Sequence, residues 1–469
     1  MRKNQLMLTA GASLLAAGSA TSCATEVEEA KLPNVIYILC DDLGCADLGC
    51  YGQDKFETPN IDAMAEGGVQ FMQHYAGCTV SAPSRCSLIT GKHTGHTHVR
   101  GNRGYKWEDG FDYDTPIPDE EVTLAEIFKQ KDYATACIGK WGLGGPHSEG
   151  HPNNQGFDYF YGYLGQGHAH HYFPSHLHEN QTMVELDGKT QYSHDLIENK
   201  ALDYIKANKD NPFFIYLTFT LPHAELVLPE EYYEDHIGEY PVETPFVRNG
   251  GSYGDQENPH AAFAGMVERL DLSVGRVNAL LKELGLDENT LVCFASDNGA
   301  HAEGGADPDY FNSTGIYRGI KRDLYEGGIR TPFIAYMPNT IPAGIKNNDI
   351  SAFWDMMPTL AELIDAESPA ESDGISILPA IMGEKQEAHH DYLYWEFHEQ
   401  GGKKAVRKGD WKLIELQVKN PGKSYYELYN VITDPSETNN VAEANPEIVK
   451  EYAEIIAGAR TKSSIFKMR

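Results

Sequence analysis

An α/β fold with a mostly parallel, doubly wound sheet is the architecture that the sequence predicts, on two observations. Apolar runs of strand length recur along the chain, and helical patterns separate them. A run that is apolar throughout indicates a strand buried on both faces, and strands separated by helices favour a parallel sheet. The expected strands are 35–40, 134–138, 213–217, 291–295 and 333–337.

Helices are predicted between these strands, and a different pattern follows residue 385. Apolar side chains at intervals of three and four indicate helices over 263–284, from Thr123 to 128, and over 352–364. Beyond residue 385, short strand-like pieces alternate with Gly, Lys and Asp. We expect a main domain over 32–385 and a subdomain over 386–469. That subdomain would hold a small antiparallel sheet from 392–395, 404–407, 411–414 and 427–430, closed by a polar helix at 446–459.

The first 22 residues predict a secretory signal peptide. Arg2 and Lys3 precede a short apolar region that ends in small residues before Cys23. Cys23 occupies the position at which bacterial lipoproteins are cleaved and lipidated, and simple cleavage is the alternative. An acidic tether over 23–31 would follow. We therefore expect an exported protein, periplasmic or anchored at the cell surface of a bacterium, with no further membrane contact.

The chain is strongly acidic, with a formal net charge of −31 at pH 7. This charge argues against nucleic acid as a partner. An anionic substrate would then need a local cationic pocket. Beyond Cys23 there are seven cysteines, an odd number without any C-x-x-C pair, which argues against a disulfide framework or a zinc site.

Carboxylates follow two of the predicted strands directly. Asp41 and Asp42 come after the strand 35–40, and Asp297 and Asn298 come after the strand 291–295. In open α/β sheets, ligands bind beyond the carboxyl ends of the strands. Three carboxylates and one amide oxygen form a hard-oxygen ligand set, which suits Ca²⁺ or Mg²⁺ better than zinc.

The segment from Ser81 to Gly91 carries a family signature. Ser81-Ala82-Pro83-Ser84-Arg85, followed by Thr90-Gly91, resembles the type I sulfatase motif (Cys or Ser)-x-Pro-(Ser/Ala)-Arg-x-x-x-x-Thr-Gly. The resemblance implies an alkaline-phosphatase-like fold and oxidation of Ser81 to formylglycine by a radical-type maturating enzyme. It also implies that Arg85 orients the hydrated aldehyde. The ligands of a single Ca²⁺ would be Asp41, Asp42, Asp297 and Asn298.

Three further motifs match this family. Lys140 stands in Gly-Lys-Trp-Gly-Leu-Gly, Lys321 precedes Tyr-Glu-Gly-Gly-Ile-Arg-Thr-Pro, and His223 follows Leu-Pro. The resemblance implies that both lysines hold the sulfate oxygens and that His223 is the general acid for the leaving oxygen. The metal, both lysines and Arg85 would then make a positive pocket in an acidic protein.

One position departs from the family pattern. Gly142 stands where the family commonly has a histidine, which is held to take the proton that eliminates sulfate. The identity of this base is therefore open. The candidates in the sequence are His147, His301, His93, His96 and His98.

Substrate contacts are expected from polar and aromatic loop residues. Arg100 and Asn102 would continue the helix that begins at Ser81. The full set of candidates is Arg100, Asn102, His168, His170, His171, His301, Glu396 and His398.

Together these features predict a sulfuric ester hydrolase that acts on a sulfated glycan, with galactose or N-acetylgalactosamine sulfates among the candidate substrates. Two alternatives remain. One is a phosphate or phosphonate ester hydrolase of the same superfamily, which would usually need a second metal cluster. The other is an inactive glycan-binding protein in which Ser81 stays unmodified.

Overall fold

A ten-stranded sheet forms the centre of the computed structural model, which describes residues 31–240 and 243–468. The predicted signal peptide, Cys23 and the tether up to residue 30 lie outside the described residues. Across the sheet the order is β13 (Ile345–Asn347), β2 (Val69–Phe71), β12 (Phe333–Tyr336), β11 (Thr290–Ser296), β1 (Asn34–Cys40), β10 (Phe213–Thr218), β6 (Ala134–Lys140), β7 (Tyr159–Tyr163), β8 (His176–Glu179) and β9 (Thr182–Glu185).

The middle of this sheet is parallel, as the sequence predicts. The strands β11, β1, β10, β6 and β7 all run in one direction. β12 differs, because it pairs antiparallel with both β11 and β2. Between β11 and β12 the chain forms loops and only the four-residue helix α6 (Glu326–Ile329), so no long crossover helix carries it back for a parallel pairing.

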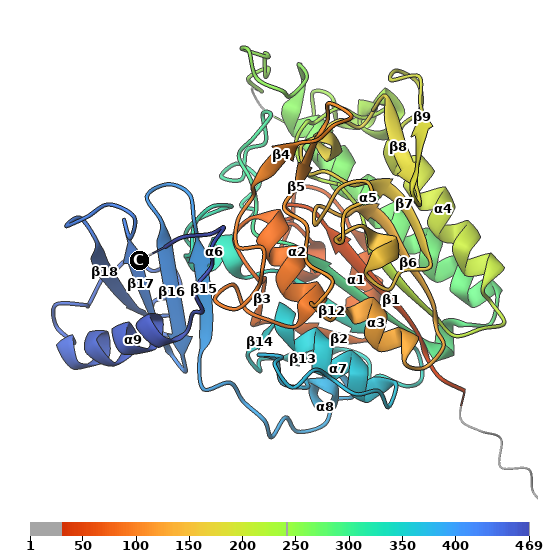
Figure 1. Cartoon of the computed structure of the whole chain (residues 1–469). Helices are drawn as coiled ribbons and strands as arrows, with labels where there is room; N and C mark the ends of the chain where they lie inside the picture. Colours follow the sequence, from red (N-terminus) through yellow and green to blue (C-terminus); the bar gives the residue numbers. More distant parts are fainter. Residues whose placement is uncertain (1–30, 241–242, 469) are drawn as a thin grey trace, which may run out of the picture. The chain divides into compact units, whose positions relative to one another are not determined.

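Helices cover both faces of the sheet (Figure 1). Side chains of β1 alternate between two hydrophobic cores, with Ile36 and Ile38 in one and Tyr37 and Leu39 in the other. The first core is covered by α1 (Pro59–Gly67), α4 (Ser193–Ala207) and α5 (Pro259–Glu283). The second is covered by α2 (Ser81–Thr90), α3 (Leu124–Lys129), α7 (Met356–Leu363) and α8 (Leu378–Ile381).

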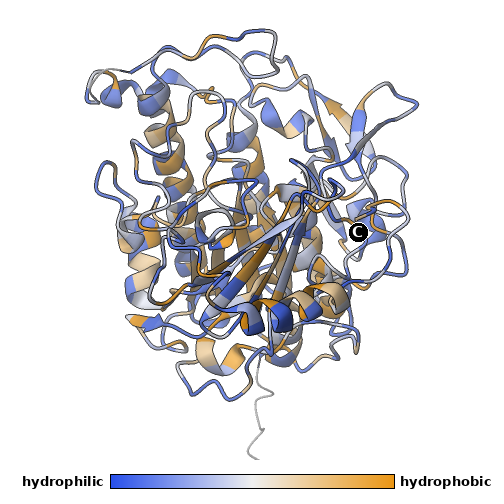
Figure 2. Ribbon diagram, turned by 90° about the vertical axis from the view of Figure 1, so that its left-hand side faces the viewer, coloured by the Kyte–Doolittle hydropathy of each residue, from blue (hydrophilic) through white to orange (hydrophobic). Residues whose placement is uncertain are grey.

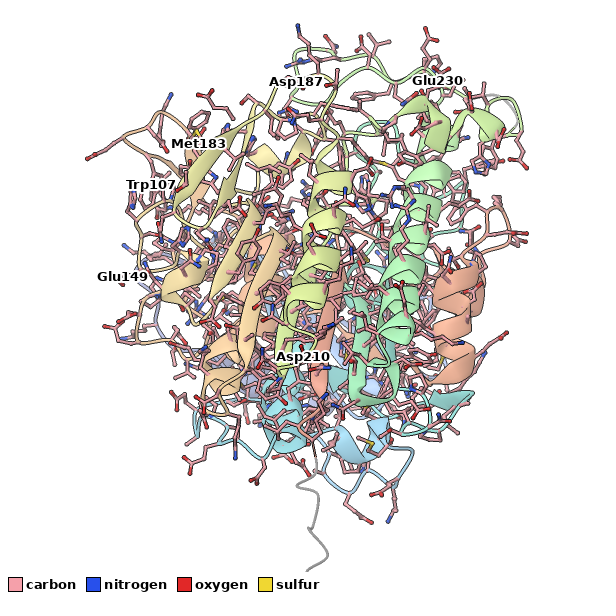
Figure 3. All side chains as sticks on the ribbon, turned by 90° about the vertical axis from the view of Figure 1, so that its right-hand side faces the viewer. Trp107, Glu149, Met183, Asp187, Asp210 and Glu230 are labelled. Carbon is pink, nitrogen blue, oxygen red and sulfur yellow. The ribbon has the colours of Figure 1, made fainter. Side chains whose placement is uncertain are left out.

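Figure 3 shows α4 and α5 side by side over the first face. Asp210, just after α4, lies at the end of the layer where β10 begins, and Asp187 and Glu230 lie at the opposite end. That opposite end is the edge at which the parallel strands finish. On the other face, α3 begins at the predicted residue, since Thr123 accepts a hydrogen bond from the Glu126 N–H in a capping box.

A second sheet follows in the chain, and it is the expected antiparallel one. Its strands pair in sequence order, and α9 (Pro446–Gly458) packs on one face through Tyr452 and Ile456. The other face packs on Tyr75 and Trp354 of the preceding chain. Figure 2, turned toward this sheet, shows apolar residues concentrated on strands and helices and polar residues on the loops. The strands are β15 (Leu393–Phe397), β16 (Lys403–Lys408), β17 (Trp411–Leu416) and β18 (Tyr425–Asn430).

Two pairs of short strands lie outside these two sheets. Two-stranded pairs are formed by β3 (His74–Tyr75) with β14 (Ser351–Ala352) and by β4 (Gly104–Lys106) with β5 (Asp112–Asp114). Among the described residues, no helix has the length and apolar character to cross a membrane.

Candidate active site

The carboxyl ends of β1 and β11 bring the four predicted metal ligands together. Asp42 adopts a left-handed backbone with φ 63°, and its N–H donates to Asp297 Oδ1 at 3.1 Å. Asn298 Nδ2 donates to Asp42 Oδ1 at 2.7 Å. Asp41, Asp42, Asp297 and Asn298 are all buried, so three carboxylates and an amide share one small space.

Ser81 lies beside this cluster as the first residue of α2. Its hydroxyl donates to Asp41 Oδ1 at 3.0 Å, and Lys140 Nζ lies 3.3 Å from Ser81 Oγ. Lys140, the last residue of β6, also donates to Asp41 Oδ2 at 2.5 Å. A helix N-terminus favours negative charge, so Ser81 occupies a position suited to a reaction at an anionic group.

Arg85, one turn further along α2, contacts the carboxylate cluster through Asp297. Its Nε and Nη2 donate to Asp297 Oδ2 at 3.1 and 2.9 Å, and its Nη1 donates to the Lys140 carbonyl. The guanidinium is fully buried. It therefore fixes Asp297 and the strand end that carries Lys140, and its Nη2 also lies 3.7 Å from Asp41 Oδ2.

Lys321 and His223 form the opposite wall. Lys321 Nζ donates to Asp42 Oδ2 at 2.7 Å and to Glu303 at 3.0 Å, and it lies 2.9 Å from His223 Nε2. His223 Nε2 is itself 3.2 Å from Asp42 Oδ2. The other ring nitrogen, Nδ1, faces the Ala224 carbonyl. His223 therefore carries its proton on Nδ1 and accepts from Lys321 on Nε2.

Burial and opposing charges set the protonation of this site. Burial alone would raise the pKa of Asp41, but the charges of Lys140 and Arg85 hold it well below its usual value. Burial and then Lys321 lower the pKa of His223. Burial and the neighbouring Asp41 raise the pKa of Asp297 to about 6. A bound cation would relieve the repulsion from Asp41 that adds to the effect of burial in this last shift.

The donor set fits a divalent metal. Asn298 uses Nδ2 toward Asp42 and toward the Gly299 carbonyl, and this leaves its Oδ1 buried without a partner. A buried acceptor without a donor is unusual in a folded protein. Ligand atoms of Asp41, Asp42 and His223 also lie within 4.8 Å of one another. Oxygen donors of this kind match Ca²⁺ or Mg²⁺.

The histidines expected to contact substrate separate into two groups. The His170 ring stacks on the His223 ring at 4.5 Å and so lies beside the site. His171 Nδ1 lies 3.5 Å from Glu225, two residues after His223. His168 instead stacks on His176 at 4.1 Å, toward β8. The structure therefore brings His170 to the site and places His168 in a separate histidine cluster.

The remaining substrate candidates cluster around the C-terminal sheet. α2 ends at Thr90, where Gly91 takes φ 67° and caps the helix, so Arg100 and Asn102 lie in the following loop and not in a continued helix. Asn102 Oδ1 accepts from the N–H of Ala82, next to Ser81. Arg100 and His398 lie 3.6 and 2.8 Å from the buried carboxylate of Glu396, which pairs with Arg460 as well. This carboxylate is committed to internal ion pairs.

Gly142 leaves room that another side chain fills. A Cβ at this position would lie 1.9 Å from Gln166 Nε2, and the backbone has φ 77°. Gln166 is buried, and its backbone N–H donates to Asp114 Oδ2 at 2.7 Å. Burial raises the pKa of the Asp114 carboxyl to about 7. The position of the family's histidine is thus closed by a neighbouring amide.

Of the candidate bases, His301 comes nearest to the site. Its ring lies 5.6 Å from that of His223. Its Nδ1 accepts from the Glu303 N–H and its Nε2 faces the Pro222 carbonyl, so both nitrogens are engaged. His147 is exposed, and no contact joins it or His98 to Ser81 or Lys140 among the residues described.

His93 and His96 lie around Asp373. His96 Nδ1 is 2.9 Å from the carboxylate, and the His93 and His96 rings stack at 4.3 Å. The Nδ1 of His93 accepts from the Gly95 N–H, which places the ring proton on Nε2, 3.8 Å from Asp373. A nitrogen that carries a proton cannot ligate a metal, so this arrangement is better described as a hydrogen-bonded pair than as a metal centre.

Sequence reasoning missed four residues at or beside the site: Glu303, Arg322, Tyr253 and Gln166. One carboxylate oxygen of Glu303 accepts a hydrogen bond from Lys321, and the other accepts one from Arg322. Burial would raise the pKa of Glu303, but the charges of these two cations lower it to about 2. Its position in the loop that follows Asp297 and Asn298 is a signal that could have been used. Gln166 follows β7, a strand that the sequence did not predict, and Tyr253 lies in a loop without a motif, so no comparable signal marks either residue.

Known proteins resemble this chain over most of its length. The family model described as sulfatase matches residues 33–366, and a model of the C-terminal part of N-sulphoglucosamine sulphohydrolase matches residues 315–462. N-acetylgalactosamine-6-O-sulfatase of Bacteroides thetaiotaomicron is 29% identical, over 94% of this chain and 97% of its own. Human arylsulfatase D is 28% identical over 80% of this chain and 72% of its own. The crystal structure of Ps i-CgsB in complex with k-i-k-neocarrahexaose superposes with a TM-score of 0.77 at 27% identity, covering 92% of this chain and 94% of that one.

Proposed function

The chain belongs to the sulfatase family and is a sulfuric ester hydrolase, and on this premise we propose that it removes sulfate from a sulfated glycan with one Ca²⁺ and a formylglycine made from Ser81. The observation that carries the proposal is the place of Ser81. Its Oγ lies at a helix N-terminus, 3.0 Å from a carboxylate of the metal-binding cluster and 3.3 Å from a lysine.

The ion would be held by Asp41, Asp42, Asp297 and Asn298. When bound, Ca²⁺ would supply a Lewis acid that stabilises negative charge on the sulfate oxygens. The free Oδ1 of Asn298 and the crowded carboxylates support this assignment. A single ion is favoured over a two-metal phosphatase site, because both nitrogens of the nearby His301 are already engaged.

The chain's own cations would bind the sulfate group. Lys140 and Lys321 approach the cluster from opposite sides, each through contact with a different aspartate. Both ammonium groups are buried, so their charge acts in a medium where electrostatic attraction is strong. Fixed cations of this kind stabilise charge that shifts from sulfur to oxygen as the ester bond breaks. Arg85 holds Asp297 and the Lys140 carbonyl in place.

His223 would donate a proton to the leaving oxygen. Its Nε2 already lies 2.9 Å from Lys321 Nζ, and the two groups can share one proton between them. As the bond to the sugar oxygen breaks, Lys321 would pass a proton to Nε2 of His223, and Nε2 would deliver it to that oxygen, which leaves Lys321 as a neutral amine. The contact of Nδ1 with the Ala224 carbonyl keeps the ring in this orientation.

The substrate class follows from the relatives rather than from the site. A relative matched over nearly its whole length is named for N-acetylgalactosamine 6-O-sulfate, so we infer a galactose or N-acetylgalactosamine sulfate. The signal-peptide pattern at residues 1–22 supports export to the periplasm or cell surface, with Cys23 as the point of lipid anchoring. A radical-type maturating enzyme would act on Ser81, because the segment carries serine at the position where the motif allows cysteine or serine.

Mass spectrometry of the peptide that contains Ser81, from protein made in its native host, tests the proposal. Oxidation of serine to formylglycine lowers the peptide mass by about two daltons. Ser81→Ala should abolish sulfate release and still bind one Ca²⁺ per chain. An unmodified Ser81 in fully active protein, or undiminished activity of Ser81→Ala, would overturn the mechanism.

A further inference from the structure

Tyr253 lies at the mouth of the active site, in a segment that no motif singles out. The segment closes on itself through the pairing of Phe246 with Gln256. Two bonds attach it beside the catalytic histidine. The Gly254 N–H donates to Glu225 at 2.8 Å, and Gln256 Nε2 donates to the Leu226 carbonyl at 2.6 Å.

The Tyr253 ring borders the catalytic histidine and its stacked neighbour. Its centroid is 5.5 Å from that of His170, with the rings tilted by 51°, and 6.3 Å from that of His223, at 64°. The hydroxyl donates to Glu303 Oε2 at 3.4 Å. Three separate contacts therefore fix the direction of the ring face.

The site has a buried floor and a partly open rim. His223 and Lys321 are 2% and 6% exposed, whereas Tyr253 and His170 are only half-buried. Tyr253 also belongs to neither of the hydrophobic cores that flank the main sheet. Its aromatic face is therefore not required for packing and remains partly available at the rim.

This position matches the part of the ester that lies beyond the leaving oxygen. A proton donor must contact the leaving oxygen, so the ring that carries this oxygen must lie next to His223. Sugar rings present C–H groups on one face, and aromatic side chains commonly line the pockets that bind such ligands. The hydroxyl of Tyr253 is used by Glu303, which leaves the ring face for the substrate.

We propose that Tyr253, together with His170, forms a subsite for the sugar ring attached to the leaving oxygen. The inference rests on the proposed function of the site and adds a binding residue to it. Tyr253 contributes affinity for the sugar and makes no contribution to the affinity for sulfate itself, which the metal cluster and the lysines hold. Glu303 positions the ring through its hydroxyl.

A binding experiment tests this without any turnover. In a Ser81→Ala background with Ca²⁺ present, calorimetry would measure the dissociation constants of galactose-6-sulfate, N-acetylgalactosamine-6-sulfate, 4-nitrophenyl sulfate and inorganic sulfate. Tyr253→Ala should weaken at least one sugar sulfate about tenfold, equivalent to roughly 1.4 kcal/mol, and leave inorganic sulfate unchanged. Tyr253→Phe should keep most of the affinity, because it retains the ring.

Tyr425→Ala is the matched control, since Tyr425 is 50% exposed on β18. Equal weakening of inorganic sulfate in Tyr253→Ala would overturn the proposal, because Tyr253 would then only support Glu303 and Lys321. A loss confined to 4-nitrophenyl sulfate, or sugar sulfates that bind no more tightly than sulfate, would overturn the assignment to a sugar. Turnover by the Ser81 protein is measured separately, so failure of the proposed reaction leaves this result interpretable.

Discussion

His223 is a neutral imidazole fixed between a carbonyl and an ammonium group. Its Nδ1 faces Ala224 and its Nε2 accepts from Lys321. Burial, and then the charge of Lys321, lowers its pKa. In the mechanism that we propose, the histidine and the lysine together would supply the proton for the leaving oxygen, since a free imidazolium would be unstable in this environment.

His223→Ala should slow hydrolysis of a sugar sulfate more than hydrolysis of an aryl sulfate. A sugar alkoxide is a poor leaving group and needs the proton, so its kcat should fall by about 10²–10⁴-fold. An activated phenolate needs little protonation and should lose far less. The ratio of kcat for N-acetylgalactosamine-6-sulfate and 4-nitrophenyl sulfate gives the answer, and an equal loss for both would mark His223 as a sulfate ligand.

At this scale the sequence predicted best those residues that directly follow a strand. Asp41, Asp42, Asp297 and Asn298 could be expected at one edge, because parallel strands end together, and the structure brings them together there. The place of Tyr253 beside His223 could not be predicted, because its loop follows no predicted strand and reaches the site only through the tertiary fold. Arg100 lies outside the predicted helix because Gly91 ends that helix, and a glycine at this position is a helix-ending signal that the sequence does contain.

The backbone conformation of the loop after β6 requires a glycine, Gly142. Gly142 has φ 77°, and its N–H donates to the Leu164 carbonyl. Gln166 occupies the space into which any side chain at this position would project. A histidine at position 142 would therefore collide with Gln166. Introducing it would disturb both the loop after β6 and the loop that contains Gln166.

Gly142→His should destabilise the protein and not improve turnover. A left-handed backbone costs a side-chain-bearing residue about 1–2 kcal/mol, and the contact with Gln166 adds to this. Thermal unfolding should show a lower Tm, with partial recovery in Gly142→His/Gln166→Gly. Gly409→Ala isolates the backbone cost, since Gly409 has φ 58° and open space around it. A fully stable Gly142→His protein would contradict this account.

Long elements were predictable and short ones were not. The apolar runs at β1, β10 and β11 are buried throughout, so their composition alone indicates strands in a parallel sheet. β2 and β13 have three residues each, too few for any pattern. The direction of β12 depends on the path of the chain around Lys321, which composition does not encode.

In the molecule as a whole, one buried charge network joins the two sheets. Lys412 on β17 lies 2.9 Å from Glu326, at the start of α6, and 2.9 Å from Glu437. Glu437 also accepts from the Glu326 N–H at 2.6 Å. The N–H of Gly299, directly after Asn298, donates to the Gly328 carbonyl in α6. The C-terminal sheet therefore supports the loop that carries Lys321 and the end of β11.

Removal of this lysine should reveal its contribution through the pH dependence of stability. Lys412→Met keeps the length of the side chain but leaves the buried Glu437 without its cation, while Glu326 keeps Arg330, and breaking a buried ion pair costs about 3–5 kcal/mol. Burial already raises the pKa of Glu437 to about 7, despite the opposing charge of Lys412. A carboxyl whose pKa is raised on folding favours the native state at low pH, and this contribution is lost as the pH rises through 7.

Lys412→Met should therefore lower the free energy of unfolding more at pH 8 than at pH 5.5, where Glu437 can take up a proton. Urea denaturation at the two pH values measures the difference. Lys423→Met, at an exposed position, is the control and should change stability by less than about 0.5 kcal/mol at either pH. If the two variants lose the same stability, the network does not join the sheets energetically, and the loop around Lys321 must be held by its contacts within the main domain.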